Sequence, residues 1–221
     1  MKRTPEPELM DAPEQALAYA EADFSEPNRL FVAHFLKLLD ERPGDSLIDL
    51  GCGPGDICVR LAEALPGWQI VGLDAGPNML ALAETAVAAR ELEHRIELIQ
   101  AYLPEELPGG RFDAIVSNSL LHHLPDPMAL WQSIAELAAP GSLVQVMDLK
   151  RPKSIEVART IVDTHADGAP EVLREDFYNS LLAAYTPDEV LDQIKAGGLH
   201  GLSLSEPSDR HWLVQGQVGH K

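Results

Sequence analysis

The sequence predicts an α/β fold with a seven-stranded, mostly parallel sheet and helices on both faces. Two observations lead to this prediction. Short apolar runs alternate with amphipathic helical patterns from residue 46 to about residue 148, and strands joined through helices form parallel sheets with right-handed crossovers. The first apolar run also ends in a turn with three glycines at alternate positions. Such a turn indicates a ligand site at the carboxyl end of that strand.

The first part of the chain reads as an arm followed by two helices. Residues 1–13 are rich in Pro and acidic residues, which favours an extended arm. Helices are expected over 13–24 and 26–40, with Ser25 as the N-cap of the second, since Ser is favoured there and apolar residues follow at helical spacing. These helices precede the sheet and are candidates to lie over the ligand site, with Tyr19 and Phe24 as candidate contacts; the alternative is that both side chains pack in the core.

The alternating part of the chain supplies five strands and three helices. Each strand is predicted from a short apolar run, and the helix at 77–93 has Met79, Leu80, Ala83, Ala86 and Val87 on one face. The strands are expected at 46–50, 69–73, 95–100, 112–117 and 142–148, and the helices at 56–65, 77–93 and 127–138.

The pattern changes after residue 150. Residues 151–185 show no strand but two helical patterns, 154–164 and 171–184, and their polar and aromatic side chains suit a cover over a substrate. The alternative is a solvated helical pair whose Tyr residues pack inward.

The carboxyl-terminal part begins with a well-marked helix. Thr186-Pro187 supplies an N-cap and a first-turn proline, and Ala196-Gly197-Gly198 closes the helix. Residues 202–205 and 212–216 then read as a terminal hairpin.

Composition limits the function classes. The 221 residues are long enough to bury a core, and the net charge of -18 argues against nucleic acid and anionic lipid as partners, since both are bound through Lys and Arg. No apolar run approaches the roughly 20 residues of a membrane span, and the amino-terminal segment lacks the apolar core of a secretion signal. With Cys52 and Cys58 as its two cysteines, the chain is expected to be cytoplasmic.

The glycine turn separates two classes of ligand. Asp49-Leu-Gly-Cys-Gly-Pro-Gly55 closes the first strand, and the second strand ends in Asp74, placed to accept hydrogen bonds from a ribose. Dinucleotide enzymes usually show G-x-G-x-x-G, with a pyrophosphate at the helix N-terminus. Here the glycine spacing differs and Asp56 follows, whose negative charge disfavours a pyrophosphate. Asp49 instead suits a ligand with a cationic amine.

The segment from Asp49 to Gly55 resembles motif I of the class I S-adenosylmethionine-dependent methyltransferases, and Val71-Gly-Leu-Asp74 resembles their acidic ribose-binding motif. The resemblance covers about residues 40–217. It implies a Rossmann-like sheet with an antiparallel C-terminal strand, S-adenosylmethionine as cofactor, S-adenosylhomocysteine as product and a small-molecule methyl acceptor. It also implies the division of the chain into a cap and arm at 1–40 and a methyltransferase domain at 41–221, with 151–185 as a substrate-cover insertion.

The resemblance further implies cofactor contacts along the strand ends. Asp49 and Gly51 sit where the family contacts the methionine part, and Asp74 where it binds the ribose diol. Ala75 and Met79 correspond to positions that pack on adenine. At the end of the third strand, where many members carry an acid, this chain has Gln100-Ala-Tyr102. The expected cofactor residues are Asp49, Gly51, Cys52, Gly53, Gly55, Asp74, Ala75, Met79, Ala101, Tyr102, Asn118, Ser119 and Tyr19.

The catalytic residues are harder to predict from the sequence than the cofactor residues. Methyl transfer is an in-line displacement to which alignment contributes effective molarities of roughly 10^5 to 10^8 M, and a base is needed only for a protonated nucleophile. His122 and His123 are candidates for that base because histidine titrates near neutrality, or one of them packs beside the cofactor. Asp148, at the end of the fifth strand, is the carboxylate expected to face the acceptor. No third ligand stands near the histidines at a recognisable spacing, so no metal is expected.

Two other function classes stay open. A nicotinamide-dependent oxidoreductase uses the same half-sheet, although the glycine spacing and the terminal hairpin disfavour it. A non-catalytic module that binds S-adenosylmethionine would keep the same pocket. The sequence leaves open the acceptor, the atom that is methylated, and whether the chain is a monomer or a homodimer.

Overall fold

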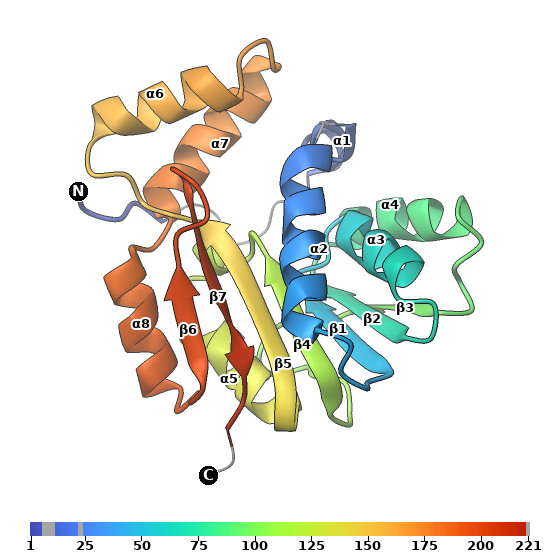
Figure 1. The fold of residues 1–221 in the computed structure, drawn as a ribbon. Coiled ribbons are helices and arrows are strands. Elements are labelled where there is room, and N and C mark those ends of the chain that lie inside the picture. Colours follow the sequence, from blue (N-terminus) through green and yellow to red (C-terminus); the bar gives the residue numbers. More distant parts are fainter. Residues whose placement is uncertain (6–11, 22–23, 220–221) are drawn as a thin grey trace.

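A computed structural model describes residues 1–5, 12–21 and 24–219. Seven strands form one sheet in the order β3-β2-β1-β4-β5-β7-β6 (Figure 1). The first five strands pair in parallel, and β7 runs antiparallel to both of its neighbours. The predicted mostly parallel sheet with an antiparallel C-terminal strand is therefore confirmed. The strands are β1 (Ser46–Leu50), β2 (Gln69–Asp74), β3 (Ile96–Gln100), β4 (Phe112–Asn118), β5 (Ala138–Leu149), β6 (Leu202–Ser205) and β7 (His211–Gln217).

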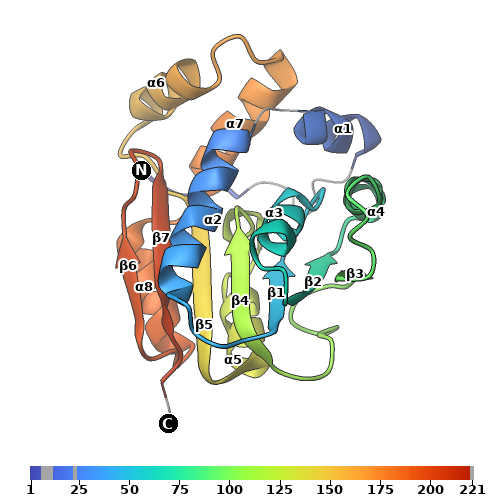
Figure 2. The same ribbon diagram turned by 45° about the vertical axis from the view of Figure 1, so that its right-hand side comes forward.

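Helices cover both faces of the sheet, as the alternating pattern predicts (Figures 1 and 2). One face packs against α2, α3 and α4, and the other against α5 and α8. The helices α6 and α7 pack on each other beyond the carboxyl ends of the strands. The helices are α1 (Pro13–Glu21), α2 (Ser25–Leu39), α3 (Asp56–Ala64), α4 (Pro77–Ala88), the 3-10 turn η1 (Leu121–His123), α5 (Met128–Leu137), α6 (Ile155–His165), α7 (Glu171–Ala183) and α8 (Pro187–Ala196).

Successive residues of each strand serve opposite faces of the sheet, because side chains alternate along a strand. In β1, Leu47 belongs to the core under α2 and α3, and Ile48 to the core under α5 and α8. The three tryptophans are divided in the same way. Trp68 belongs to the first core, and Trp131 and Trp212 to the second, all of them buried.

The amino-terminal helix α2 is part of the main core. Phe31 and Phe35 are fully buried against the sheet, and the side-chain amide of Gln145 on β5 donates to the carbonyl of Phe31 at 2.8 Å. The boundary proposed at residue 40 therefore does not separate two packing units, because α2 and the strands share one core. Of the arm expected at 1–13, residues 6–11 lie outside the described residues, as do residues 22–23 at the end of the first expected helix.

Several element boundaries differ from the sequence prediction. Ser25 is the first residue of α2 rather than its N-cap, because the amide of Asn28 already bonds the carbonyl of Phe24. The helix expected at 77–93 ends at Ala88, where the chain turns through Glu91 with φ of 56°.

The strand expected at 142–148 differs at both of its ends. It starts at Ala138, ends at Leu149 and contains an irregularity in its pairing with β4. Apolar periodicity alone did not mark these ends.

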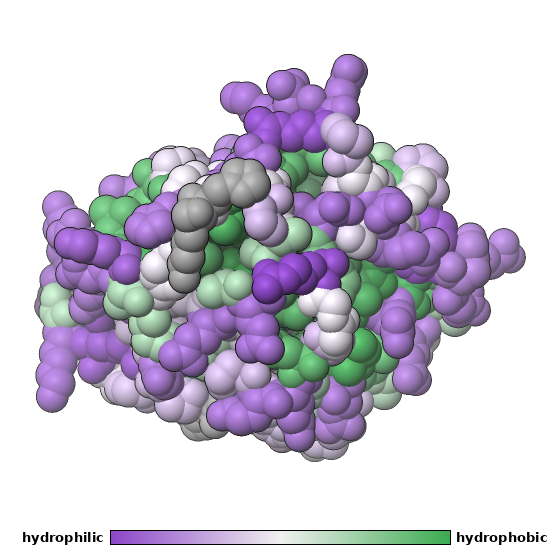
Figure 3. Space-filling model, turned by 90° about the horizontal axis from the view of Figure 1, so that it is seen from below, coloured by the Kyte–Doolittle hydropathy of each residue, from purple (hydrophilic) through white to green (hydrophobic). Residues whose placement is uncertain are grey.

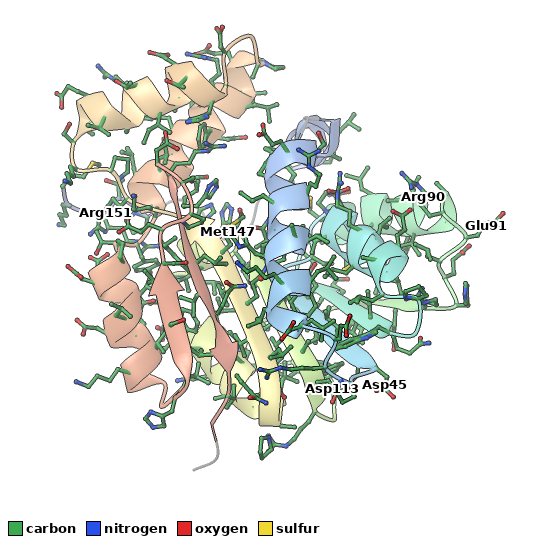
Figure 4. The ribbon with its side chains drawn as sticks, viewed as in Figure 1. Asp45, Arg90, Glu91, Asp113, Met147 and Arg151 are labelled. Atoms are coloured by element: carbon green, nitrogen blue, oxygen red, sulfur yellow. The ribbon has the colours of Figure 1, made fainter. Side chains whose placement is uncertain are left out.

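Hydrogen bonds to one carboxylate fix the lower end of the sheet. Asp113 on β4 accepts from the amides of Asp45 and Ser46 at 2.9 and 3.2 Å (Figure 4). Figure 3 views the molecule from this end, where hydrophilic residues alternate with smaller hydrophobic areas. No helix in the described part of the chain combines the length and the apolar character that crossing a membrane requires.

Phe31→Ala is expected to lower the free energy of unfolding by about 3 to 5 kcal/mol, because it leaves a cavity in a close-packed core. Leu30→Ala, at the neighbouring position where the side chain is 42% exposed, is expected to change it by less than about 1 kcal/mol. Urea unfolding of both variants measures the difference. Equal effects of the two substitutions would contradict the assignment of α2 to the core.

Candidate active site

A cavity of about 1330 Å³ lies at the carboxyl ends of the parallel strands. It is bounded by α1 and α2, by the glycine turn, and by the segment that joins α6 to α7. Met147, near the end of β5, is part of its lining (Figure 4). The sequence-predicted residues that line it are Tyr19, Asp49, Gly51, Cys52, Gly53, Asp74, Ala75, Met79, Ala101, Tyr102, Asn118, Ser119, His122 and His123. Gly55 and Asp148 do not line it.

The three glycines of the turn have different roles. Gly51, Gly53 and Gly55 all have positive φ, which favours glycine. A Cβ atom on Gly51 would lie 2.8 Å from Leu120, and one on Gly55 would lie 3.0 Å from Ala83. A Cβ atom on Gly53 would meet nothing within 4 Å. Gly53 therefore faces the open cavity, whereas Gly51 and Gly55 allow close packing. Gly55 does not line the cavity, and its contact with a ligand stays a prediction.

Asp74 holds the two loops that frame this end of the cavity. One carboxylate oxygen accepts from the amide of Gly53, and the other accepts from the amide of Gly76, both at 2.8 Å. Gly76 directly precedes α4, so the carboxylate joins the glycine turn to the start of that helix. This contact positions an acid at the end of β2, beside Ala75 and Met79 in the lining.

One carboxylate oxygen of Asp49 is buried and can accept a hydrogen bond from a ligand. The side chain is 1% exposed, and Oδ2 accepts from the thiol of Cys58 at 3.4 Å. Oδ1 has no hydrogen-bond partner among the described residues, and buried polar atoms in native proteins are usually paired. Burial raises the pKa of Asp49 to about 7; the Cys58 hydrogen bond lowers it and the charge of Asp74 raises it further. A ligand amine fits this site.

Affinity for S-adenosylhomocysteine is expected to rise with pH because of Asp49. Below its raised pKa the free protein holds this carboxyl neutral, and a cationic amine favours the ionised form. From about pH 8 to about pH 5.5 the affinity should fall roughly tenfold or more, since each unit below the pKa costs up to a factor of ten. Calorimetric titration at both pH values measures the change. Asp49→Asn should remove most of the pH dependence, and an equally steep profile in that variant would contradict the assignment.

The opposite end of the cavity contains a buried histidine–aspartate pair. Nδ1 of His122 lies 2.5 Å from Oδ1 of Asp148, and the His122 amide donates to Oδ2 of the same carboxylate at 3.2 Å. Asp148 is 1% exposed, and Oδ1 also accepts from the amide of Leu149. The expectation that Asp148 faces the acceptor is therefore wrong, because the strand points its carboxylate at His122.

The pairing sets the proton position on His122. A carboxylate accepts from Nδ1–H, which places the lone pair of the neutral ring on Nε2, the nitrogen that takes up a proton. The ring of His122 lines the cavity although the residue is 3% exposed. The arrangement can therefore act as a general base supported by a carboxylate.

His123 and Tyr19 have other properties. The His123 ring lies 4.1 Å from the His122 ring, centroid to centroid. Burial, and to a smaller extent His122, holds the pKa of His123 well below its ordinary value, so this ring stays neutral. Burial, with the charges of Asp148 and Asp74, raises the pKa of Tyr19 to about 12. Tyr19 therefore keeps its proton and can act as a donor but not as a base.

The segment between α6 and α7 lines the cavity together with Leu173 and Phe177 of α7. It is fastened to the β6–β7 turn, where His165 Nε2 lies 2.9 Å from Asp209 and Arg210 contacts the same imidazole. Residues between 164 and 180 therefore form part of the cavity wall, and their role as a substrate cover stays a prediction.

Sequence reasoning missed Asn28 in the cavity. Its side chain donates to Asp56 at 2.7 Å and accepts from Asn118 at 3.4 Å. In the sequence Asn28 looks like a solvated residue of α2, and nothing local links it to the strand ends.

The fold and the strand-end site define a Rossmann-like protein that binds a nucleoside-bearing ligand. Residues 48–144 match the family described as "Methyltransferase domain". The ubiquinone biosynthesis O-methyltransferase of Cereibacter sphaeroides is 30% identical over 180 residues, which are 77% of this chain and 64% of that protein. The chain spans 45% of the length of the corresponding Xanthomonas campestris enzyme. These comparisons support a class I S-adenosylmethionine-dependent methyltransferase, with the methyltransferase domain matched at residues 48–144.

Solved structures agree with this fold. A SAM-dependent methyltransferase from Aquifex aeolicus superposes with a TM-score of 0.68 at 17% identity, covering 94% of this chain and 98% of that one. The plantazolicin methyltransferase BamL, solved with a triazolic desmethylPZN analog and SAH (S-adenosylhomocysteine), gives 0.74 at 15% identity, with 95% and 92% covered. At these identities the likeness shows the fold.

Proposed function

We propose that this protein transfers a methyl group from S-adenosylmethionine to a small-molecule acceptor. One observation carries the proposal: a single cavity joins the glycine turn with Asp49 and Asp74 at one end to the His122–Asp148 pair at the other. Ligand-binding groups and a proton acceptor in one cavity suit a group transfer between two molecules.

The residues present fit the cofactor. Asp74 would hold the ribose diol, the unpartnered Oδ1 of Asp49 would meet the amine, and Ala75 and Met79 would pack on the adenine. Gly53 leaves the turn open on the cavity side. When bound, S-adenosylmethionine supplies an electrophilic methyl group on a sulfonium.

The protein's own contribution is alignment, exclusion of water and acceptance of a proton. The cover formed by residues 164–180 keeps the acceptor away from bulk solvent. Nε2 of His122 would accept the proton of an acceptor hydroxyl, a step that typically contributes about 10^2- to 10^4-fold. The Cereibacter relative is named as an O-methyltransferase, which supports hydroxyl compounds as the first acceptors to screen.

Calorimetric titration with S-adenosylmethionine, S-adenosylhomocysteine and NAD tests the cofactor class. We expect both adenosyl ligands to bind at micromolar concentrations and NAD not to bind. NAD binding alone would overturn the proposal in favour of an oxidoreductase. Binding of the adenosyl ligands without turnover of any hydroxyl, amine or thiol acceptor would favour a non-catalytic module.

The remaining expectations also belong to this proposal. A small molecule rather than nucleic acid as partner is supported by the net charge of -18. A cytoplasmic location is supported by Cys52 and Cys58, which are both free and buried. The absence of a metal stays a prediction.

A further inference from the structure

The amino-terminal residues lie against the His122 end of the cavity, far in sequence from everything they contact. Nη2 of Arg3 donates to the carbonyl of His122 at 3.0 Å and to that of Leu124 at 3.5 Å. Nε of Arg3 donates to the carbonyl of Ala183, and the guanidinium carbon lies 4.2 Å from the centre of the Tyr185 ring. One side chain therefore joins η1, which carries His122, to the end of the cover helix α7.

The carbonyls of His122 and Ala183 lie at the ends of η1 and α7, where a hydrogen-bond donor from another part of the chain is needed. The last carbonyls of a helix have no amide partner within it, and a cation is favoured at that end. A guanidinium offers five donors in a rigid planar fork and stacks on aromatic faces, which suits several carbonyls and a ring at once. The amide of Thr4 adds a bond to the carbonyl of Leu182 at 3.0 Å.

The imidazole and the backbone of His122 are thus restrained from opposite sides. Asp148 holds Nδ1 of the ring and the backbone amide of His122, and Arg3 holds the carbonyl of the same residue. Arg3 does not itself line the cavity. Any effect it has on a reaction there must pass through η1 or through α7.

We propose that Arg3 is a positioning residue: it fixes the backbone of His122 and couples this turn to α7, so that the imidazole is correctly aimed when the cover lies over the cavity. The catalytic consequence rests on the proposed function, whereas the positioning of His122 does not. The expected cofactor residues Asp49 and Asp74 lie on β1 and β2, whereas the hydrogen bonds of Arg3 go to Ala183, His122 and Leu124, so we expect their ligand contacts not to depend on Arg3.

The matched variants are Arg3→Gln, Arg3→Lys and, as control, Lys2→Gln. Lys2 is exposed, so its variant removes the same charge one position away. In the Arg3→Gln protein, amides of residues 121–124 and 181–185 should exchange with solvent about tenfold faster or more, because bonds from a charged donor are lost. The imidazole nitrogen resonances of His122 should shift, whereas those of His94, which precedes β3 at the amino ends of the parallel strands, should not.

The effect on binding and turnover separates positioning from general destabilisation. Affinity for S-adenosylhomocysteine should stay within about twofold of wild type, while kcat for a hydroxyl acceptor falls about tenfold or more, the cost of losing hydrogen bonds from a charged group. Added guanidinium should restore part of kcat in an Arg3→Ala variant, and Arg3→Lys should lie between Arg3→Gln and wild type because it keeps the charge but not the fork.

Two results would overturn this inference. One is that the His122 resonances and the exchange at 121–124 in Arg3→Gln match those of Lys2→Gln. The other is that affinity for S-adenosylhomocysteine falls as much as kcat, which indicates a merely structural role. If wild type binds neither adenosyl ligand, the proposed function fails, but the resonance and exchange measurements, which need no ligand, still decide the role of Arg3.

Discussion

Asp148→Asn is expected to slow methyl transfer by about 10^2- to 10^4-fold, the range that a general base contributes. The carboxylate accepts from Nδ1 of His122 at 2.5 Å and so keeps the proton off Nε2. An amide at position 148 can donate instead, which favours the tautomer with its proton on Nε2, and that nitrogen can then no longer accept one. The change keeps the size of the side chain, so the surrounding core should persist.

Single-turnover rates with saturating S-adenosylmethionine measure the chemical step. Affinity for S-adenosylhomocysteine should stay within about threefold of wild type, because Asp148 lies outside the cavity lining and its loss removes no ligand hydrogen bond. Asp113→Asn is the matched control at the opposite end of the sheet, where the rate should not change. Combining Asp148→Asn with His122→Gln should slow the reaction little more than His122→Gln alone, since the two residues act as one unit. An unchanged rate in Asp148→Asn would exclude a base supported by this carboxylate.

Asp74→Ala is expected to weaken S-adenosylhomocysteine binding by about tenfold to a hundredfold, because the hydrogen bonds that we propose to the ribose diol are lost together with those that hold the cavity wall. The structure provides a second reason for the loss of affinity. The same carboxylate accepts from the amides of Gly53 and Gly76, so the substitution also releases the glycine turn from the start of α4.

Calorimetry measures the loss, and Asp56→Asn is the matched control. Asp56 also lines the cavity but is half-exposed and paired with Arg60 at 2.6 Å, and exposed pairs contribute about 1 kcal/mol or less. Its variant should bind within about threefold of wild type. Equal losses in the two variants would indicate a general effect of negative charge rather than a specific contact at Asp74.

The sheet could be predicted from the sequence because its signals are local. β1 has the predicted bounds. Thr186 is the predicted N-cap of α8, and Thr186 and Glu189 form reciprocal hydrogen bonds with each other's backbone amides. The end of α4 was not predictable in this way, since no Gly or Pro marks it and the chain turns through Glu91 instead. A helix end made by a non-glycine residue in the left-handed region leaves no compositional signal.

The residues at the strand ends that line the cavity could be predicted from the sequence. The directions in which individual side chains point could not. The strand ends brought Asp49, Asp74 and His122 to one cavity, as topology requires. Asp148 lies at a strand end too, but the pleat turns its carboxylate away from the cavity, and position alone did not reveal this. Arg3 contacts residues 119 and 180 positions away, and no local pattern encodes such a contact.

The burial of all three tryptophans affects how this protein can be studied by fluorescence. Trp68, Trp131 and Trp212 lie in the two cores beside the sheet, and none of them lines the cavity. Their emission should therefore report unfolding with a strong signal and ligand entry with almost none. Any change in emission on adding an adenosyl ligand would reveal that the cores themselves rearrange. A tryptophan introduced at Phe177, which lines the cavity, would provide a direct optical reporter of acceptor entry.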